Sequence, residues 1–183
     1  WLAGRRLGLP VVATIRGKIV SLSRRALRRL QITSMLRGVD ARIAVSRSLA
    51  AWVRRLAGSD LPVDVIPNGI NTALFRPMPE IARQHNRFIV TNSADTPLKG
   101  LKFLLEAVAE IRKKQPIKLT VIGQPKKDGI IENLVAKLGV HDIVHFTGRI
   151  ENEEFADYYA QSTIAVVPSL YEGFGIPAAE AMA

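Results

Sequence analysis

The chain has 183 residues, of which 48% are apolar and 23% are charged, and it has no cysteine. This composition is typical of a globular domain and excludes an intrinsically disordered chain, which would lack the apolar surface that offsets the entropy of ordering. The absence of cysteine excludes disulfides, thiolate metal sites and cysteine nucleophiles, and it is compatible with a cytoplasmic protein.

The net charge of +10 is concentrated near the start of the chain. Residues 1–60 hold 13 basic and two acidic side chains, a balance of +11, whereas residues 61–183 hold 13 basic and 14 acidic ones, a balance of −1. A local excess of this kind favours a polyanionic partner, such as membrane headgroups, nucleic acid or a phosphorylated substrate.

The chain alternates short runs of Val and Ile with helical patterns, which is typical of an α/β fold with parallel sheets. In chain order, the predicted strands are Val11–Ile15, Arg42–Ser46, Val63–Pro67, Arg87–Thr91, Lys118–Ile122, Ile143–Phe146 and Ile164–Val167. The predicted helices are Ser21–Leu36, Ser48–Ala57, Leu101–Lys114, Ile130–Leu138, Glu153–Gln161 and one that opens at Pro177.

The first predicted helix lies within the most basic segment, residues 16–37. Its apolar residues recur at three- and four-residue steps, and its arginines lie mostly on the other side; the apolar positions are Ile19, Leu22, Ala26, Leu27 and Leu30. Two interpretations stay open: a helix packed on the core with a solvated basic face, or a peripheral contact with the inner face of an anionic membrane. Nucleic acid is not expected, because no aromatic residues are interleaved with these arginines.

A domain boundary is predicted near Pro67-Asn68-Gly69, where a strand ends at proline and Asn-Gly signals a turn. This gives one unit over residues 1–67 and another over residues 68–183, with three and four predicted strands. A doubly wound domain usually has five or six strands. Both units are therefore expected to be incomplete, and the chain is expected to be an internal, inactive fragment of a larger two-domain protein.

The segment Pro168–Glu180 is the main candidate for chemistry, because it connects a buried strand to a helix, where open α/β sheets bind ligands. Gly173 and Gly175 allow backbone amides to approach an anion, and the following helix start suits phosphate. Glu172 in the loop and Glu180 in the first helical turn are placed to bracket a ligand rich in hydroxyls. The alternative is an ordinary tight turn with Phe174 in the core.

The string Tyr171-Glu-Gly-Phe-Gly-Ile-Pro-Ala-Ala-Glu-Ala-Met-Ala resembles the signature of the family-4 retaining glycosyltransferases, which are GT-B enzymes with two Rossmann-like domains. Further motifs are similar to that family in the same order, over about residues 40–183. They are Ala44-Val-Ser-Arg-Ser-Leu, Val65-Ile-Pro-Asn-Gly-Ile-Asn-Thr-Ala-Leu-Phe-Arg-Pro77, Lys99-Gly-Leu-Lys-Phe-Leu-Leu-Glu-Ala, Leu119-Thr-Val-Ile-Gly123 and Val144-His-Phe-Thr-Gly148.

The resemblance implies that residues 1–67 end the acceptor-side domain and that residues 68–183 begin the domain that binds a nucleotide sugar. It implies that Glu180 holds the ribose hydroxyls, that Glu172 lies at the donor sugar as the catalytic carboxylate, and that Lys99 neutralises the diphosphate. The remaining donor-site residues that it implies are Gly123, Arg149 and Ile150 at the nucleobase, and Phe174, Gly175 and Ile176 at the sugar and diphosphate. From the residues alone, Lys99 and Arg149 are equally typical of solvated positions.

The sequence departs from the family pattern in two places. Ser93 and Ala94 stand where many members have Gly-Arg, and Arg16 stands where a histidine is common. The first departure leaves the diphosphate to Lys99, alone or together with Lys102 or an arginine from the first unit. The chemistry that the resemblance implies is metal-independent and needs no cofactor other than the donor substrate. A sugar passes, with retention of configuration, from a nucleotide diphosphate to the hydroxyl of a carbohydrate or lipid-linked acceptor.

Two other functions stay open. One is a different GT-B enzyme, such as a nucleotide-sugar epimerase, which needs an acid/base pair that the histidines do not supply; they are His85, His141 and His145. The other is a non-catalytic module whose basic first third binds membranes or nucleic acid.

Overall fold

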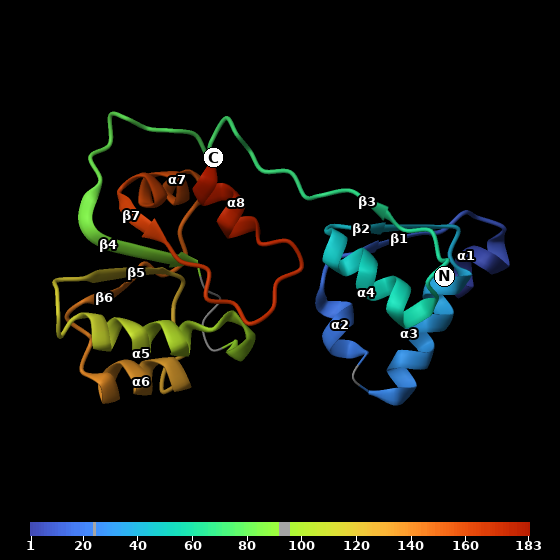
Figure 1. Ribbon diagram of the computed structural model, residues 1–183, viewed down its shortest axis with the longest axis horizontal. Coiled ribbons are helices and arrows are strands. Elements are labelled where there is room, and N and C mark those ends of the chain that lie inside the picture. Colours follow the sequence, from blue (N-terminus) through green and yellow to red (C-terminus); the bar gives the residue numbers. More distant parts are fainter. Residues whose placement is uncertain (24, 92–95) are drawn as a thin grey trace. The chain divides into compact units, whose positions relative to one another are not determined.

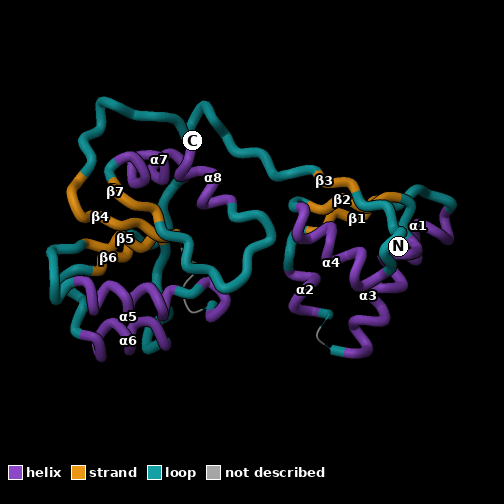
Figure 2. The backbone as a smooth tube through the Cα atoms, viewed as in Figure 1, coloured by secondary structure: helices purple, strands orange, loops and turns teal. Residues whose placement is uncertain are grey.

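The computed structural model describes residues 1–23, 25–91 and 96–183. The chain forms two compact units, each with its own parallel sheet and helices (Figure 1; Figure 2). The first unit comprises Trp1–Gly69 with Glu172–Phe174, and the second comprises Ile70–Tyr171 with Gly175–Ala183. The parallel sheets confirm the predicted α/β class.

The first unit contains a three-stranded parallel sheet of order β1-β2-β3. Its strands are β1 (Val12–Ile15), β2 (Ala41–Ala44) and β3 (Asp64–Val65). Its helices are α1 (Leu2–Leu7), α2 (Lys18–Leu22), α3 (Ala26–Gly38) and α4 (Arg47–Ala57). The unit has its own apolar core, in which Leu36 of α3 and Val53 of α4 are fully buried.

The single predicted helix Ser21–Leu36 is wrong, because the structure has two helices, α2 and α3, in this region. The predicted apolar face is also wrong over most of its length: Leu27 is 79% exposed and Leu30 is 68% exposed. The residues of α3 that pack on the core lie one turn later, at Ile32, Met35 and Leu36. The helix is therefore anchored by its C-terminal half, and the periodic stripe before it faces solvent.

The second unit contains a four-stranded parallel sheet of order β6-β5-β4-β7. Its strands are β4 (Gln84–Thr91), β5 (Lys118–Ile122), β6 (Val144–Phe146) and β7 (Ser162–Ala165). Its helices are η1 (Pro97–Lys99, a 3-10 turn), α5 (Leu101–Ile111), α6 (Ile130–Leu138), α7 (Asn152–Ala160) and α8 (Ile176–Met182). Figure 1 shows α5 and α6 on one face of this sheet, and α7 and α8 on the other.

The core of the second unit lies between its sheet and the α5–α6 pair. Val90 of β4 and Val121 of β5 point to the same face because they are paired in register, and both are fully buried. They pack with Leu105 and Val108 of α5, which are three residues apart and therefore share one helix face. This packing fixes where the strands end, and therefore where side chains that follow the strands are placed.

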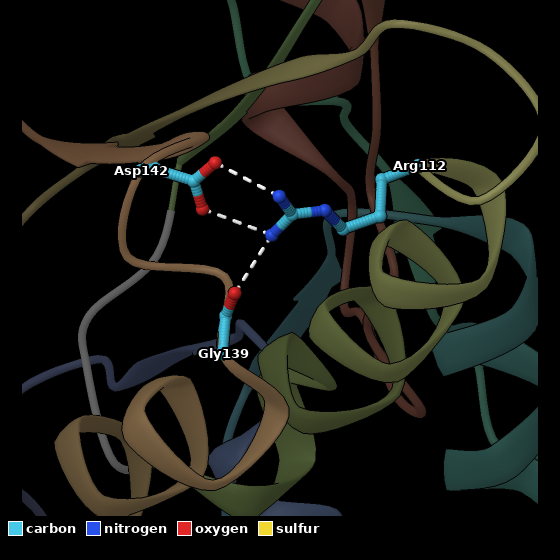
Figure 3. Close-up of polar contacts among 3 residues, drawn as sticks. All are labelled: Arg112, Gly139 and Asp142. Atoms are coloured by element: carbon cyan, nitrogen blue, oxygen red, sulfur yellow. Dashed lines mark hydrogen bonds and ion pairs between the residues drawn. The ribbon is translucent and has the colours of Figure 1, made fainter.

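An ion pair holds the connection between α6 and β6 (Figure 3). Arg112, at the end of α5, donates to both carboxylate oxygens of Asp142 at 2.9 and 2.8 Å, and to the carbonyl oxygen of Gly139 at 2.7 Å. The Arg112 guanidinium holds the pKa of Asp142 below its usual value. The pair lies at the amino end of β6 and fixes the entry into that strand.

Within the described residues, no helix combines the length and the apolar character needed to cross a membrane.

Candidate functional site

A cavity of about 480 Å³ opens at the carboxyl ends of the strands of the second sheet. Parallel strands all end at the same edge, so residues far apart in the sequence meet there. The ends of β4 and β5, the turn after β6, and residues from η1, α7 and α8 form the lining, which is Thr91, Lys99, Ile122, Gly123, Gln124, Gly148, Arg149, Ile150, Phe155 and Pro177.

The floor of this cavity is shaped by two glycine turns. Gly123 follows β5 with a φ of 130°, and its carbonyl accepts a hydrogen bond from the Gly148 amide at 3.2 Å. Gly123 and Gly148 form an isolated antiparallel bridge, and the Gly123 amide donates to Thr147 Oγ1 at 3.4 Å. The bridge ties the turn after β6 to the end of β5, which brings Arg149 and Ile150 to the rim of the same cavity.

Lys99 is fixed by the turn that follows it. Gly100 has a φ of 71°, and a Cβ at this position would lie 2.0 Å from the carbonyl oxygen of Pro168. The Leu170 amide donates to the Leu98 carbonyl at 2.9 Å, which joins the same two segments a second time. Only glycine allows so close an approach, and the approach holds Lys99 beside the loop that leaves β7.

The helix α8 begins at Ile176, directly after Gly175, whose φ is 88°. Glu180 is therefore the fifth residue of this helix, and the expectation that it lies in the first turn is wrong. Glu180 lines a different cavity from Lys99, together with Phe75 and Tyr159. Burial raises the pKa of the Glu180 carboxyl above its usual value.

The structure thus brings together one group of the residues singled out in the sequence and leaves others apart. Lys99, Gly123, Arg149 and Ile150 line one cavity. Gly175 and Ile176 immediately precede Pro177, which lines the same cavity, whereas Glu180 does not. Two further residues, Glu172 and Phe174, are grouped with the first unit. Two more, Ser93 and Ala94, lie outside the described residues.

The cavity also contains residues that the sequence patterns did not single out. Thr91 is the last residue of β4, and its buried Oγ1 lies beside the hydroxyl of Tyr159. Gln124 follows β5 in the same way. Both could have been found from the rule that ligands bind beyond the carboxyl ends of parallel strands, because each ends or follows a predicted strand. Phe155 of α7 reaches the cavity from a helix, and no sequence signal marked it.

The lining suits a ligand that has both charge and apolar surface. Lys99 and Arg149 supply two positive charges, Gln124 supplies a polar side chain, and Phe155 with Ile122 supplies apolar surface. Over residues 1–23, 25–91 and 96–183, no three His, Asp or Glu side chains are grouped so that they could hold a metal ion.

Comparison with protein families places both units. Residues 78–183 match the model described as "Glycosyl transferases group 1", and residues 1–74 match "Glycosyltransferase Family 4".

Among curated relatives, the chain is 41% identical over 138 residues to the MMP alpha-(1->4)-mannosyltransferase of Mycolicibacterium hassiacum, covering 75% of this chain and 33% of that protein. It is 29% identical over 211 residues to the D-inositol 3-phosphate glycosyltransferase of Streptomyces scabiei, covering 100% of this chain and 47% of that protein. The chain therefore spans between a third and a half of the length of these relatives.

Among solved structures, the sucrose-phosphate synthase of Thermosynechococcus elongatus matches with a TM-score of 0.82 and 27% identity, covering 99% of this chain and 51% of that one. The structure of Anabaena Alr3699/HepE in complex with UDP and glucose matches with a TM-score of 0.81 and 20% identity, covering 99% of this chain and 52% of that one, and shows the shared fold.

Proposed function

This chain belongs to the group 1 glycosyl transferases, and from that premise we propose that its second unit binds the nucleoside-diphosphate part of a sugar donor. The observation that carries the proposal is the cavity that gathers Lys99, Gly123, Arg149 and Ile150 at the carboxyl edge of the second sheet. Lys99 supplies a positive charge that suits a diphosphate, and the part of the lining around Arg149 and Ile150 suits a nucleobase.

The reaction that we propose for the whole protein is retaining transfer of a sugar from this donor to an acceptor hydroxyl, without a metal ion. Lys99 would stabilise the charge that develops on the leaving diphosphate, and a phosphate oxygen would help to deprotonate the acceptor. Glu172 would lie at the donor sugar, with Phe174, Gly175 and Ile176 contributing loop contacts. Glu180 would hold the ribose hydroxyls.

The acceptor that we propose is the hydroxyl of a carbohydrate or a lipid-linked carbohydrate. One relative is named for mannosyl transfer, and another is named for D-inositol 3-phosphate, which carries several hydroxyls. Because the chain spans at most about half of these relatives, we expect donor binding, and not turnover, from the 183-residue chain by itself.

The donor site is tested by isothermal titration of the chain with UDP, GDP and ADP. Replacing Lys99 by Ala removes one charge from the diphosphate site, and we expect the dissociation constant to rise about tenfold or more. Lys118→Ala is the matched control, because Lys118 lies at the amino end of β5, whereas the cavity lies at the carboxyl ends of the strands. Equal affinities of the wild type and both variants, or no binding of any nucleotide by the wild type, would remove this assignment.

We also propose that the first unit touches an anionic membrane, at the inner face in a cytoplasmic enzyme. The specific observation is the exposed pair Leu27 and Leu30 on α3, which lies among the exposed Arg25, Arg28 and Arg29. Apolar side chains that insert between headgroups, with arginines that pair with lipid phosphates, are the elements of an interfacial helix. Its test follows in the Discussion.

A further inference from the structure

Tyr159 connects three parts of the second unit that are distant in the sequence. It lies near the end of α7, and its ring packs edge-to-face on Phe75 with the centroids 6.0 Å apart and the planes at 69°. Its hydroxyl donates to the carbonyl oxygen of Pro177, in the first turn of α8, at 3.3 Å. Pro177 lines the cavity that contains Lys99, whereas Tyr159 and Glu180 line a second cavity.

The hydroxyl of Tyr159 also lies within electrostatic reach of Glu180. Burial raises the pKa of Tyr159 to about 12, the charge of Glu180 acts in the same direction, and the nearby Thr91 hydroxyl acts weakly against both. The phenol therefore keeps its proton at neutral pH and remains a hydrogen-bond donor. Glu180 is three residues after Pro177, so the two lie on the same side of α8, which faces Tyr159.

We propose that Tyr159 is a positioning residue, which holds the first turn of α8 through Pro177 and so sets the place of Glu180 for the ribose of the donor. This inference rests on the proposed function and assigns a new residue to it. Tyr159 does not line the cavity of Lys99, but its hydroxyl contacts Pro177 of α8 and Thr91 of β4, which both line it. The proposal assigns its action to the contact with α8.

The substitution Tyr159→Phe tests this role with little change in packing, because phenylalanine keeps the ring that contacts Phe75. The substitution removes the hydrogen bond to Pro177 and the interaction of the hydroxyl with Thr91. We expect the dissociation constant for the tightest-binding member of the panel UDP, GDP and ADP to rise about fivefold, the usual size for one neutral hydrogen bond.

The neighbouring residue supplies the matched control. Tyr158 is on the same helix and is half-buried, but its ring lies beside the guanidinium of Arg87, 5.6 Å from the ring centroid. The same change, Tyr158→Phe, is expected to leave the dissociation constant within about twofold of the wild type. Equal rises of the dissociation constant for the two substitutions would overturn the proposal, because they would show that the loss of either tyrosine hydroxyl on α7 weakens nucleotide binding.

A double-mutant cycle with Glu180→Gln shows whether Tyr159 acts through Glu180. If it does, Tyr159→Phe weakens binding about fivefold when Glu180 is present and less than about twofold when residue 180 has been changed. A structural role of Tyr159 alone would weaken binding equally in both backgrounds, and that result would overturn the proposal.

A ribose probe makes the test sharper. The effect of Tyr159→Phe should shrink when the 2′-deoxy analogue of the same nucleoside diphosphate is titrated, because Glu180 then has fewer hydroxyls to hold. An undiminished effect would contradict the route through the ribose. The two proposals fail differently: wild type that binds none of the three nucleotides overturns the proposed function and this inference with it, whereas binding that depends on Lys99 but not on Tyr159 overturns this inference alone.

Discussion

The two units have the same type of sheet but differ in how the helices and polar residues around it are arranged. In the second unit, α5 buries five apolar residues against the core, and polar residues that follow the strands gather in one cavity. In the first unit, α3 leaves Leu27 and Leu30 in solvent among arginines, and the net charge of the first 60 residues is +11, from 13 basic and two acidic side chains. The second unit is thus organised around an interior site, and the first around a charged exterior.

The difference shows that hydrophobic periodicity predicts a helix more safely than it predicts burial. Both α3 and α5 carry apolar residues at helical spacing. In α5 they are buried from Leu101 to Ala109, whereas in α3 only those near its end, Ile32, Met35 and Leu36, pack on a core. A periodic stripe is buried only where another element covers it, and the sequence of the helix itself does not contain that information.

The largest loss of stability is expected from Gly100→Ala, and it is expected in the second unit only. An alanine there would need a φ of 71° and would place its Cβ 2.0 Å from the Pro168 carbonyl, so we expect the second unit to lose about 3 kcal/mol or more of unfolding free energy. Far-UV circular dichroism in urea would follow this loss. Tryptophan emission reports the first unit, because Trp1 and Trp52 are the two tryptophans of the chain.

The control for that substitution is Gly139→Ala at the end of α6. Gly139 has a similar φ of 63°, but a Cβ there meets nothing within 4 Å. Its cost should be limited to backbone strain, about 1 kcal/mol. Equal losses for the two variants would show that the approach of Pro168 is unimportant, and a shift of the tryptophan transition with Gly100→Ala would show that the units do not unfold separately.

The parts of this architecture that could be predicted are those that local sequence determines. The strand Lys118–Ile122 and the helix Ile130–Leu138 have the predicted bounds, because a Val/Ile run and an apolar period with a glycine stop are local signals. The meeting of Lys99 with Gly123 and Arg149 followed from family motifs and not from spacing. The contact of Tyr159 with Pro177 was beyond prediction, since it depends on how α7 and α8 pack across the same sheet face.

An effect of intermediate size, on vesicle binding, is expected from a substitution on the charged exterior of the first unit. Leu27→Gln replaces an apolar side chain at the centre of the arginine cluster. We expect binding to vesicles of phosphatidylcholine with phosphatidylglycerol to fall about tenfold, as the loss of one inserted leucine implies. Cosedimentation of the chain with vesicles measures this. Binding should also weaken as salt is raised and should be slight on phosphatidylcholine alone.

The matched control for this experiment lies in the other unit. Ile130 begins α6 and is 67% exposed, close to the 79% of Leu27, but it belongs to the second unit. Ile130→Gln should leave vesicle binding unchanged. Equal losses for both variants, or binding that is indifferent to lipid charge, would contradict a membrane surface on α3 and would leave its arginines as a solvated face.

The smallest effect concerns the half-buried carboxyl of the second unit. Because burial raises the pKa of Glu180, the folded state favours its protonated form, and stability is lost as the pH rises through that raised pKa. Tyr159, Arg76 and Arg83 line the same cavity, so the loss is partly screened. Glu180→Gln removes the charge, and we expect it to stabilise the chain by a few tenths of a kcal/mol at about pH 8 and to have no effect near pH 4. Thermal melting at both pH values measures this, with Glu106→Gln as the control, since Glu106 is exposed on α5 near Lys102.

A variant that gains stability while it loses nucleotide affinity would show that this carboxylate is kept for binding at a cost to the stability of the fold. If Glu180→Gln is instead less stable than the wild type at pH 8 and equally stable at pH 4, then the ionised carboxylate stabilises the fold. That result would weaken the contrast between an interior site in the second unit and a charged surface on the first.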